Sequence, residues 1–318
     1  VFIAGWLQLL FQWPALAQIG LVPRPKLNFS HPGVKRVGVL MLPALLGVSV
    51  SQINLLLDTV LATFLQKGSI SWLYYSDRLL ELPLALFGIA IATVILPALS
   101  ADYAKSDEDR FAAKLDWAIR LVLLFGLPAS IALVILADVL IATIFYHGAM
   151  TQFDLVMAGL SLKAYAAGLT AHMMVKVLAP GFFARQDMKT PVKIGIIALV
   201  TNMVFNLVLI GFLGHIGLAL ATSISAFVNA FLLWRALSMS SIYRPGAQWL
   251  KFIVRIGFAL VLMQGLLLMI VPSLDQWLSY ALEDQILALF GLCAVGSTLY
   301  LITLWLLGLR VSDFRDQI

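Results

Sequence analysis

Long runs of apolar residues limit the folds that this chain can adopt. A helix needs about 20 apolar residues to cross a bilayer, and Gly, Pro and charged residues divide the 318-residue sequence into nine runs of that kind. No run has the pattern of lipid-facing strands. The sequence therefore predicts an all-α, polytopic transmembrane bundle with spans near 1–20, 37–65, 71–99, 117–145, 154–182, 191–213, 215–239, 249–272 and 285–309.

The composition excludes the soluble classes of protein. Hydrophobic residues make up 62% of the chain and charged residues 12%, whereas a soluble domain has about 25% charged residues. So few charges cannot cover a water-facing surface of this size, which excludes soluble enzymes and a nucleic-acid partner. A single cysteine, Cys293, rules out an intramolecular disulfide and argues against a cysteine-based metal site.

The ends and loops predict the orientation. The chain begins at Val1 inside an apolar run with no basic n-region, so we interpret it as a fragment and not as a signal peptide. Cytoplasmic loops retain Lys and Arg, and one alternate set of loops contains nearly all of them, whereas the other contains Lys67. The 272–285 hairpin has acidic residues and no basic ones, so we place it outside and the C-terminus in the cytoplasm.

Three ionisable residues lie together inside the 71–99 span. A charge at the bilayer centre costs about 2.5–3.5 kcal/mol on insertion scales, so such residues face a bundle interior or a wet cavity. Guanidinium is the preferred bidentate partner of phosphate. We therefore predict a substrate-binding site formed by Asp77, Arg78 and Glu81, with Arg78 on a phosphate. The alternative is that neighbouring carboxylates neutralise Arg78, which then serves packing only.

A second polar set comes from separate spans. Asp58 lies deep in the 37–65 span, Asn202 and Asn206 share a helix face at i and i+4, and Thr222 follows a short turn at 211–217. One carboxylate with amide and hydroxyl oxygens suits a hard monovalent cation. We predict a cation site at these four residues and no other metal site. The alternative is that the asparagines and the threonine only link neighbouring helices by hydrogen bonds.

The remaining polar residues inside spans have simpler interpretations. Lys176 and His172 are four residues apart and could line a cavity, but lysine side chains reach the interface readily, and we interpret Lys163 in the same way. Asp116 and Arg120 are predicted to form a local ion pair. There is no nucleotide-binding or hydrolase motif, so we predict that the protein is not an enzyme and needs no organic cofactor.

Three segments carry a resemblance to a known family. Residues 45–53, residues 74–83 and above all residues 176–193, which read KVLAPGFFARQDMKTPVK, resemble the MurJ (MviN) family of lipid II flippases, within the superfamily of multidrug and oligosaccharidyl-lipid exporters. The resemblance implies two six-helix lobes and two extra helices. In this chain it implies the last helix of the first lobe at 1–20, a cytoplasmic linker at 21–36, the second lobe at 37–240, and the extra helices with a short tail at 241–318.

The resemblance also implies a function. The family translocates the peptidoglycan precursor lipid II from the cytoplasmic to the periplasmic leaflet of the bacterial inner membrane, in cell-wall biogenesis and cell shape. Arg78 matches a cavity arginine, and the extra helices match a groove for the polyprenyl tail. The partner would be lipid II, with sodium or a proton as the coupling cation at Asp58. Most cavity arginines belong to the absent first lobe, so the chain alone should not flip lipid.

Two alternatives stay open from the sequence. One is an exporter of the same superfamily that carries another polyprenyl-linked oligosaccharide or a drug. The other is an integral membrane enzyme acting on polyprenyl lipids, which should show a carboxylate-rich motif in a cytoplasmic loop. The acidic loop at 106–110 is the nearest match, and we interpret it as a solvated turn.

Overall fold

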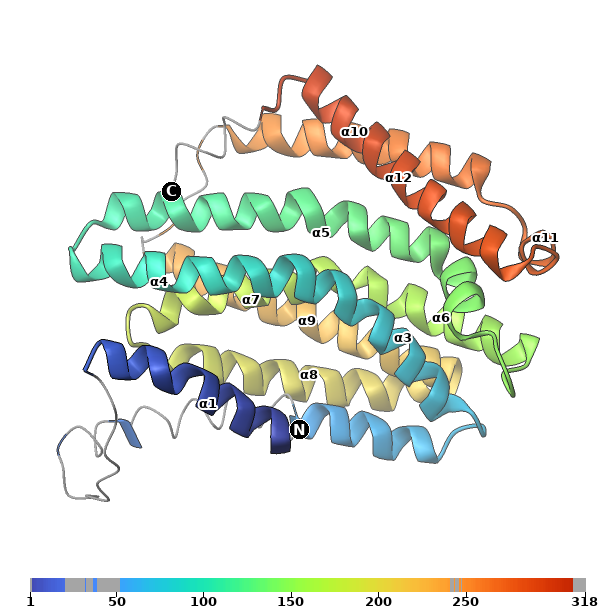
Figure 1. Cartoon of the computed structure of the whole chain (residues 1–318), viewed down its shortest axis with the longest axis horizontal. Coiled ribbons are helices and arrows are strands. Elements are labelled where there is room, and N and C mark those ends of the chain that lie inside the picture. Colours follow the sequence, from blue (N-terminus) through green and yellow to red (C-terminus); the bar gives the residue numbers. More distant parts are fainter. Residues whose placement is uncertain are drawn as a thin grey trace. The chain divides into compact units, whose positions relative to one another are not determined.

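The computed structural model describes residues 2–20, 32, 37–38, 52–240, 243, 246 and 248–310. Within these residues all regular elements are helices (Figure 1), which confirms the predicted all-α class. The chain divides into two compact units, Val1–Leu42 and Pro43–Ile318. The first contains α1 (Phe2–Gln18), and the second contains the site residues discussed below.

The second unit begins its described part with helical residues 52–63. The later elements are α3 (Ser69–Pro83), the π-helix η1 (Leu84–Ile89), α4 (Ala90–Ala104), α5 (Glu108–Phe145), α6 (Gln152–Ala167), α7 (Leu169–Phe183), α8 (Lys189–Leu213), α9 (His215–Met239), α10 (Trp249–Ile270), α11 (Leu274–Leu278) and α12 (Leu282–Leu306).

Seven of the nine predicted spans appear as helices long and apolar enough to cross a membrane, by length and composition. The predicted span at 1–20 corresponds to α1, which has 17 residues. The predicted span at 37–65 lies partly outside the described residues, and its part at 52–63 is helical. The predicted loop at 21–36 also lies outside them, except residue 32.

The structure adds detail to two predicted regions. The predicted span at 154–182 corresponds to Gln152–Phe183 and contains a break between α6 and α7 at Gly168, where the Ser223 side chain of α9 packs against the Gly168 backbone. A Cβ atom on Gly168 would lie 2.5 Å from Ser223 Oγ, whose hydroxyl donates to the Ala164 carbonyl at 2.7 Å. The predicted short turn is confirmed: α8 ends at Leu213 and α9 begins at His215, as the predicted spans have it, and Gly214, with φ of 55°, reverses the chain between them.

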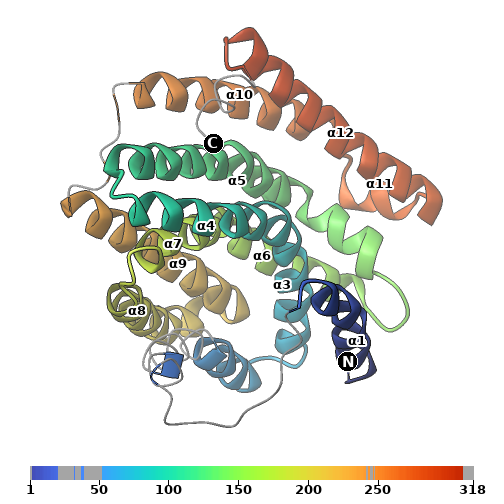
Figure 2. The same ribbon diagram turned by 60° about the vertical axis from the view of Figure 1, so that its left-hand side comes forward.

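The long helix α5 separates two parts of the second unit. The other lobe helices pack on one side of α5, and the pair α10 and α12 packs on the other, as both views show (Figures 1 and 2). Tyr300 of α12 donates a hydrogen bond to the Leu124 carbonyl of α5 at 2.9 Å. This arrangement creates a groove between the lobe and the two C-terminal helices.

Candidate functional site

The buried Asp58 carboxylate is the centre of the polar interior of the lobe. Asp58 lies on helical residues 52–63 and is 7% exposed. Its Oδ1 accepts a hydrogen bond from Asn206 Nδ2 at 2.6 Å, and its Oδ2 accepts one from the Thr222 hydroxyl at 3.1 Å. Among the described residues no basic side chain forms an ion pair with it. The hydrogen-bond partners of this carboxylate within the described part of the chain are therefore amide and hydroxyl groups.

Both asparagines of α8 belong to the same cluster. Asn202 and Asn206 are fully buried, and Asn206 Nδ2 also donates to Asn202 Oδ1 at 2.8 Å. If the Asn202 amide is reversed, its nitrogen lies 3.2 Å from Asp58 Oδ1 and its oxygen accepts from the Thr222 hydroxyl. Asn202 thus joins the cluster in either orientation. The structure brings together all four residues of the predicted cation site.

One oxygen in this cluster has no hydrogen-bond partner among the residues that the structure describes. This oxygen, Asn206 Oδ1, is buried, and buried polar oxygens are nearly always satisfied. Its neighbours in the cluster are oxygens of a carboxylate, an amide and a hydroxyl, the ligand types that hard cations prefer. These oxygens are of the types that bind a hard monovalent cation, and the hydrogen bonds among the four residues also link neighbouring helices.

A polar cavity of about 310 Å³ extends from Asp58. Its described lining combines carboxylates, a lysine, a histidine and several hydroxyl and amide groups, from residues 52–63, α3, η1, α6, α7, α8 and α9. The polar residues are Asn54, Asp58, Asp77, Tyr165, His172, Lys176, Thr222, Ser225 and Asn229. We call it the lobe cavity. The expectation that His172 and Lys176 could line a cavity is met here.

The structure separates the three residues of the predicted substrate site. Arg78 Nη1 lies 2.7 Å from Glu81 Oε2, and both side chains are about half exposed, at 51% and 52%. The Arg78 guanidinium also lies 4.9 Å from the centre of the Tyr74 ring. Asp77 lines the lobe cavity instead. Arg78 and Glu81 thus form an accessible pair, and Asp77, on the same helical turn, lines the lobe cavity.

Two polar contacts in the structure were not predicted from the sequence. Lys163 forms an ion pair that was not predicted, because its Nζ lies 2.6 Å from Asp138 Oδ2 of α5. Asp138 stands inside an apolar run, which is a signal that could have identified it. Asn54 lies four residues before Asp58 and reaches its carboxylate at 3.5 Å, and that spacing was also visible.

The predicted Asp116–Arg120 ion pair is confirmed, with Arg120 Nε 2.6 Å from Asp116 Oδ2. The other carboxylate oxygen accepts hydrogen bonds from the Tyr243 hydroxyl at 2.7 Å and from Trp249 Nε1 at 2.6 Å. This pair therefore also links α5 to the start of α10.

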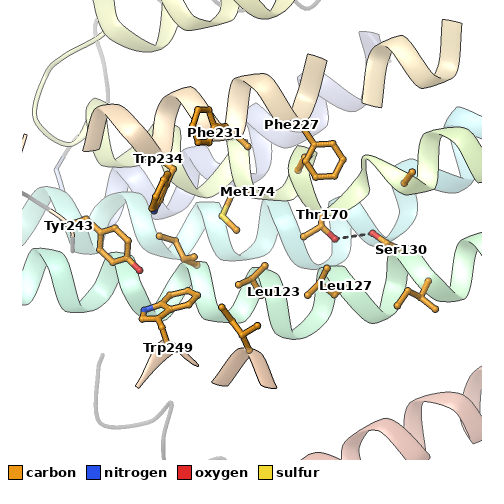
Figure 3. Close-up of a pocket in the computed structure, with 16 residues that line it drawn as sticks. Leu123, Leu127, Ser130, Thr170, Met174, Phe227, Phe231, Trp234, Tyr243 and Trp249 are labelled. Carbon is orange, nitrogen blue, oxygen red and sulfur yellow. Dashed lines mark hydrogen bonds between the residues drawn. The ribbon is translucent and has the colours of Figure 1, made fainter. Parts of the chain in front are cut away.

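Two apolar cavities flank α5. One of about 300 Å³ lies among η1, α5, α10 and α12, and Phe87, Met263 and Gly296 are part of its lining. The other, of about 580 Å³, has Tyr243 and Trp249 at one end and the Ser130–Thr170 hydrogen bond, 2.9 Å long, at the other (Figure 3). No charged side chain lines either cavity among the described residues.

Comparison with known proteins decides the family. The family model described as "Lipid II flippase MurJ" matches residues 1–283. The chain belongs to the MurJ family. A probable lipid II flippase MurJ of Vibrio cholerae serotype O1 is 49% identical over 315 residues, which are 99% of this chain and 60% of that protein. The lipid II flippase MurJ of Burkholderia cenocepacia is 38% identical over 322 residues, 100% of this chain and 62% of that protein.

Solved structures agree with this assignment. A lipid II flippase MurJ in an inward closed conformation matches with a TM-score of 0.69 and 27% identity, over 90% of this chain and 57% of that one. An outward-facing multidrug transporter of the MATE family matches with a TM-score of 0.57 at 18% identity, over 71% of this chain and 51% of that one, and shows a shared fold alone. The chain spans about 60% of the length of its MurJ relatives.

Proposed function

We propose that the protein translocates lipid II from the cytoplasmic to the periplasmic leaflet of the bacterial inner membrane, as the C-terminal part of a MurJ-type flippase. The observation that carries this proposal is the match of the MurJ family model to residues 1–283. The resemblance to multidrug transporters concerns the fold only, and a membrane-enzyme function finds no support in the family. Translocation breaks no covalent bond, so the protein's residues need only bind, neutralise and release the head group.

The accessible Arg78–Glu81 pair supports binding of the diphosphate. Because both side chains are half exposed, a phosphate can replace Glu81 as the partner of the guanidinium at little desolvation cost. The planar guanidinium then donates two parallel hydrogen bonds to one phosphate. In our proposal Arg78 neutralises the head group, with Glu81 as its partner when substrate is absent. Asp77 would contribute through the lobe cavity and not by direct contact.

The apolar cavity of about 300 Å³ among η1, α5, α10 and α12, which we call the tail groove, supports binding of the polyprenyl tail. Its lining is apolar, and it lies between the lobe and the α10–α12 pair. A Cβ atom on Gly296 would lie 3.3 Å from Leu267 Cδ2, so a small residue at 296 keeps α10 and α12 close on this side. We propose that the first isoprene units of the tail lie here while the head group meets Arg78.

Crosslinking tests the tail groove. A photoreactive amino acid at Cys293 or Leu301, two exposed residues of the groove lining, is expected to label polyprenyl lipid several times more strongly than one at Val134, a partly exposed position on α5 outside that lining. Mass spectrometry of the crosslinked lipid gives the measurement. Labelling at the two groove positions no greater than at Val134 would remove the groove from the proposal.

The Asp58 cluster supports coupling to a monovalent cation. When bound, the cation would neutralise a carboxylate that is otherwise costly to keep charged in a low-dielectric interior. The residues that would hold it are Asp58, Asn202, Asn206 and Thr222. Alternating access then needs two lobes that rock against each other. An inside-negative potential favours outward movement of the anionic head group by about 2.3 kcal/mol per charge per 100 mV.

We propose that an N-terminal lobe completes the transporter, and that the C-terminus is cytoplasmic, as the basic loops predict.

To test the function, the N-terminal lobe of the Vibrio cholerae relative is fused to this chain and expressed in bacteria depleted of their own lipid II flippase. We expect the fusion to restore growth and periplasmic exposure of lipid II. The chain alone is the control and should restore neither. A fusion that reaches the membrane yet moves no lipid II contradicts the proposal.

A further inference from the structure

The apolar cavity of about 580 Å³ has no part in the transport function proposed above. It lies between α5, α7, α9 and the start of α10, and Leu123, Met174, Phe227 and Phe231 are among its lining residues (Figure 3). We call it the α9 cavity. We propose that the α9 cavity holds one acyl chain of a membrane phospholipid as a resident ligand, and that it recognises the hydrocarbon chain and not the head group.

The lining of the α9 cavity suits a chain without charge. No charged side chain lines it among the described residues, and the polar groups at its two ends already have partners. The Tyr243 hydroxyl and Trp249 Nε1 donate hydrogen bonds to Asp116 at 2.7 Å and 2.6 Å. At the other end Ser130 and Thr170 share a hydrogen bond of 2.9 Å. A hydrocarbon chain can therefore enter without taking a hydrogen-bond partner from any of them.

The length of the α9 cavity matches the depth of one leaflet. Its lining on α5 runs from Ile119 to Ile131, which is about 18 Å at a rise of 1.5 Å per residue. Half of the hydrocarbon core of a bilayer is about 15 Å. Tyr243 and Trp249 stand at one end (Figure 3), as aromatic residues do where a membrane protein meets the head groups. A phospholipid chain, which spans one leaflet, thus fits the cavity in depth.

The rim of the α9 cavity gives access from the side. Phe227 and Phe231 of α9 and Ile253 of α10 line the cavity and are about half exposed. The helix α9 packs on α6, α7 and α8, whereas α10 packs on α5 and α12, so the rim lies between two separate groups of helices. An unfilled cavity would deprive its lining of dispersion contacts. A chain from the surrounding bilayer restores those contacts.

The tail of lipid II has a different path. Leu123 of α5 lines the α9 cavity and Phe125 lines the tail groove; two residues apart on a helix means about 200° of rotation, so they point to opposite sides of α5. Phe87 of η1, the element that follows α3 and Arg78, also lines the tail groove. No described residue of α3 or η1 lines the α9 cavity. We therefore assign the α9 cavity to bulk phospholipid and not to the substrate.

Photo-methionine tests the proposal in the native fold. This diazirine analogue replaces the 10 methionines of the chain, and the protein is reconstituted in vesicles of equal parts phosphatidylethanolamine and phosphatidylglycerol. Met174 lines the α9 cavity, its neighbour Met173 is fully buried, and Met269 of α10 is highly exposed. Illumination followed by mass spectrometry of the peptides, before and after a detergent wash, gives the lipid adducts at each methionine.

A resident chain should resist the wash. Adducts at Met269 should fall by about tenfold, because detergent replaces the bulk lipid there. Adducts at Met174 should fall by less than about twofold, since a chain held in a packed cavity dissociates slowly. Met173 should give none. The adducts at Met174 should contain the two phospholipids in the proportions of the vesicle, because no charged side chain of the described lining distinguishes their head groups.

Filling the cavity should remove the ligand. Ala230 lines the α9 cavity, and in Ala230→Phe a ring takes the place of the chain, so the wash-resistant adducts at Met174 should fall by about tenfold. Ala294→Phe makes the same change at an exposed position of α12 outside the cavity lining and should keep them. If Ala230→Phe is not recovered as folded protein, Leu127→Phe takes its place.

Four results would overturn the proposal. Adducts at Met174 that wash away like those at Met269 would make the cavity ordinary lipid-facing surface. Undecaprenyl phosphate, added to the vesicles, would assign the cavity to a polyprenyl tail if it replaced phospholipid in the adducts at Met174. Strong enrichment of phosphatidylglycerol would show recognition of the head group. Unchanged wash-resistant labelling of Met174 in folded Ala230→Phe or Leu127→Phe would place the labelled chain outside the cavity.

Discussion

Replacing Arg78 with alanine is expected to abolish lipid II translocation while the protein still inserts in the membrane. Hydrogen bonds to charged groups contribute about 1.5–3 kcal/mol each, so loss of a bidentate pair should reduce transport by roughly 100-fold or more. Folding should survive, because the Arg78 side chain is half exposed and its ion-pair partner Glu81 is on the same helix. Transport is measured in the fusion with the N-terminal lobe, by accessibility of lipid II on the periplasmic side.

Two further variants sharpen this test. Arg78→Lys keeps the charge but loses the planar pair of donors, so it should restore transport only in part. Arg235→Ala removes an exposed arginine from α9 that lies outside the proposed site, and it should transport normally. Full activity in Arg78→Ala would exclude Arg78 from recognition of the diphosphate.

Replacing Asp58 with asparagine is expected to remove the response of transport to sodium and to lower transport by about tenfold, within the range of typical coupling energies between two sites. The variant has nearly the same shape as aspartate but no charge, so a bound cation would lose its one anionic ligand in the cluster. The measurement is the transport rate of reconstituted protein as sodium is replaced by a large organic cation.

The matched control for Asp58 lies on α8. Thr201→Val removes a hydroxyl whose hydrogen bond, within the described part of the chain, goes to the Ile197 carbonyl of its own helix at 2.8 Å, so sodium response should be kept. Asn206→Leu, in contrast, removes the amide bonded to Asp58 and should resemble Asp58→Asn. An unchanged sodium response in both Asp58→Asn and Asn206→Leu would leave the cluster with a packing role only.

Much of the cation cluster could be predicted from the sequence. The i, i+4 spacing of Asn202 and Asn206 guarantees one helix face, and the short connection between α8 and α9 guarantees that these helices are neighbours, which brings Thr222 within reach. The sequence contains one reason to expect Asp58 beside them, which is the cost of leaving a charged carboxylate in the bilayer. The direct hydrogen bond from Asn206 to Asp58 could be seen only in the structure.

The sequence by itself determined the helical class and most of the spans, because hydropathy and helical period act over short stretches of chain. Tertiary structure alone decided which faces of the helices contact one another. It placed Asp77 in the lobe cavity and Arg78 outside it, paired Lys163 with Asp138, and broke a predicted helix at Gly168 against Ser223. In each case the deciding factor is the rotation and close approach of helices distant in sequence, which no local pattern of residues records.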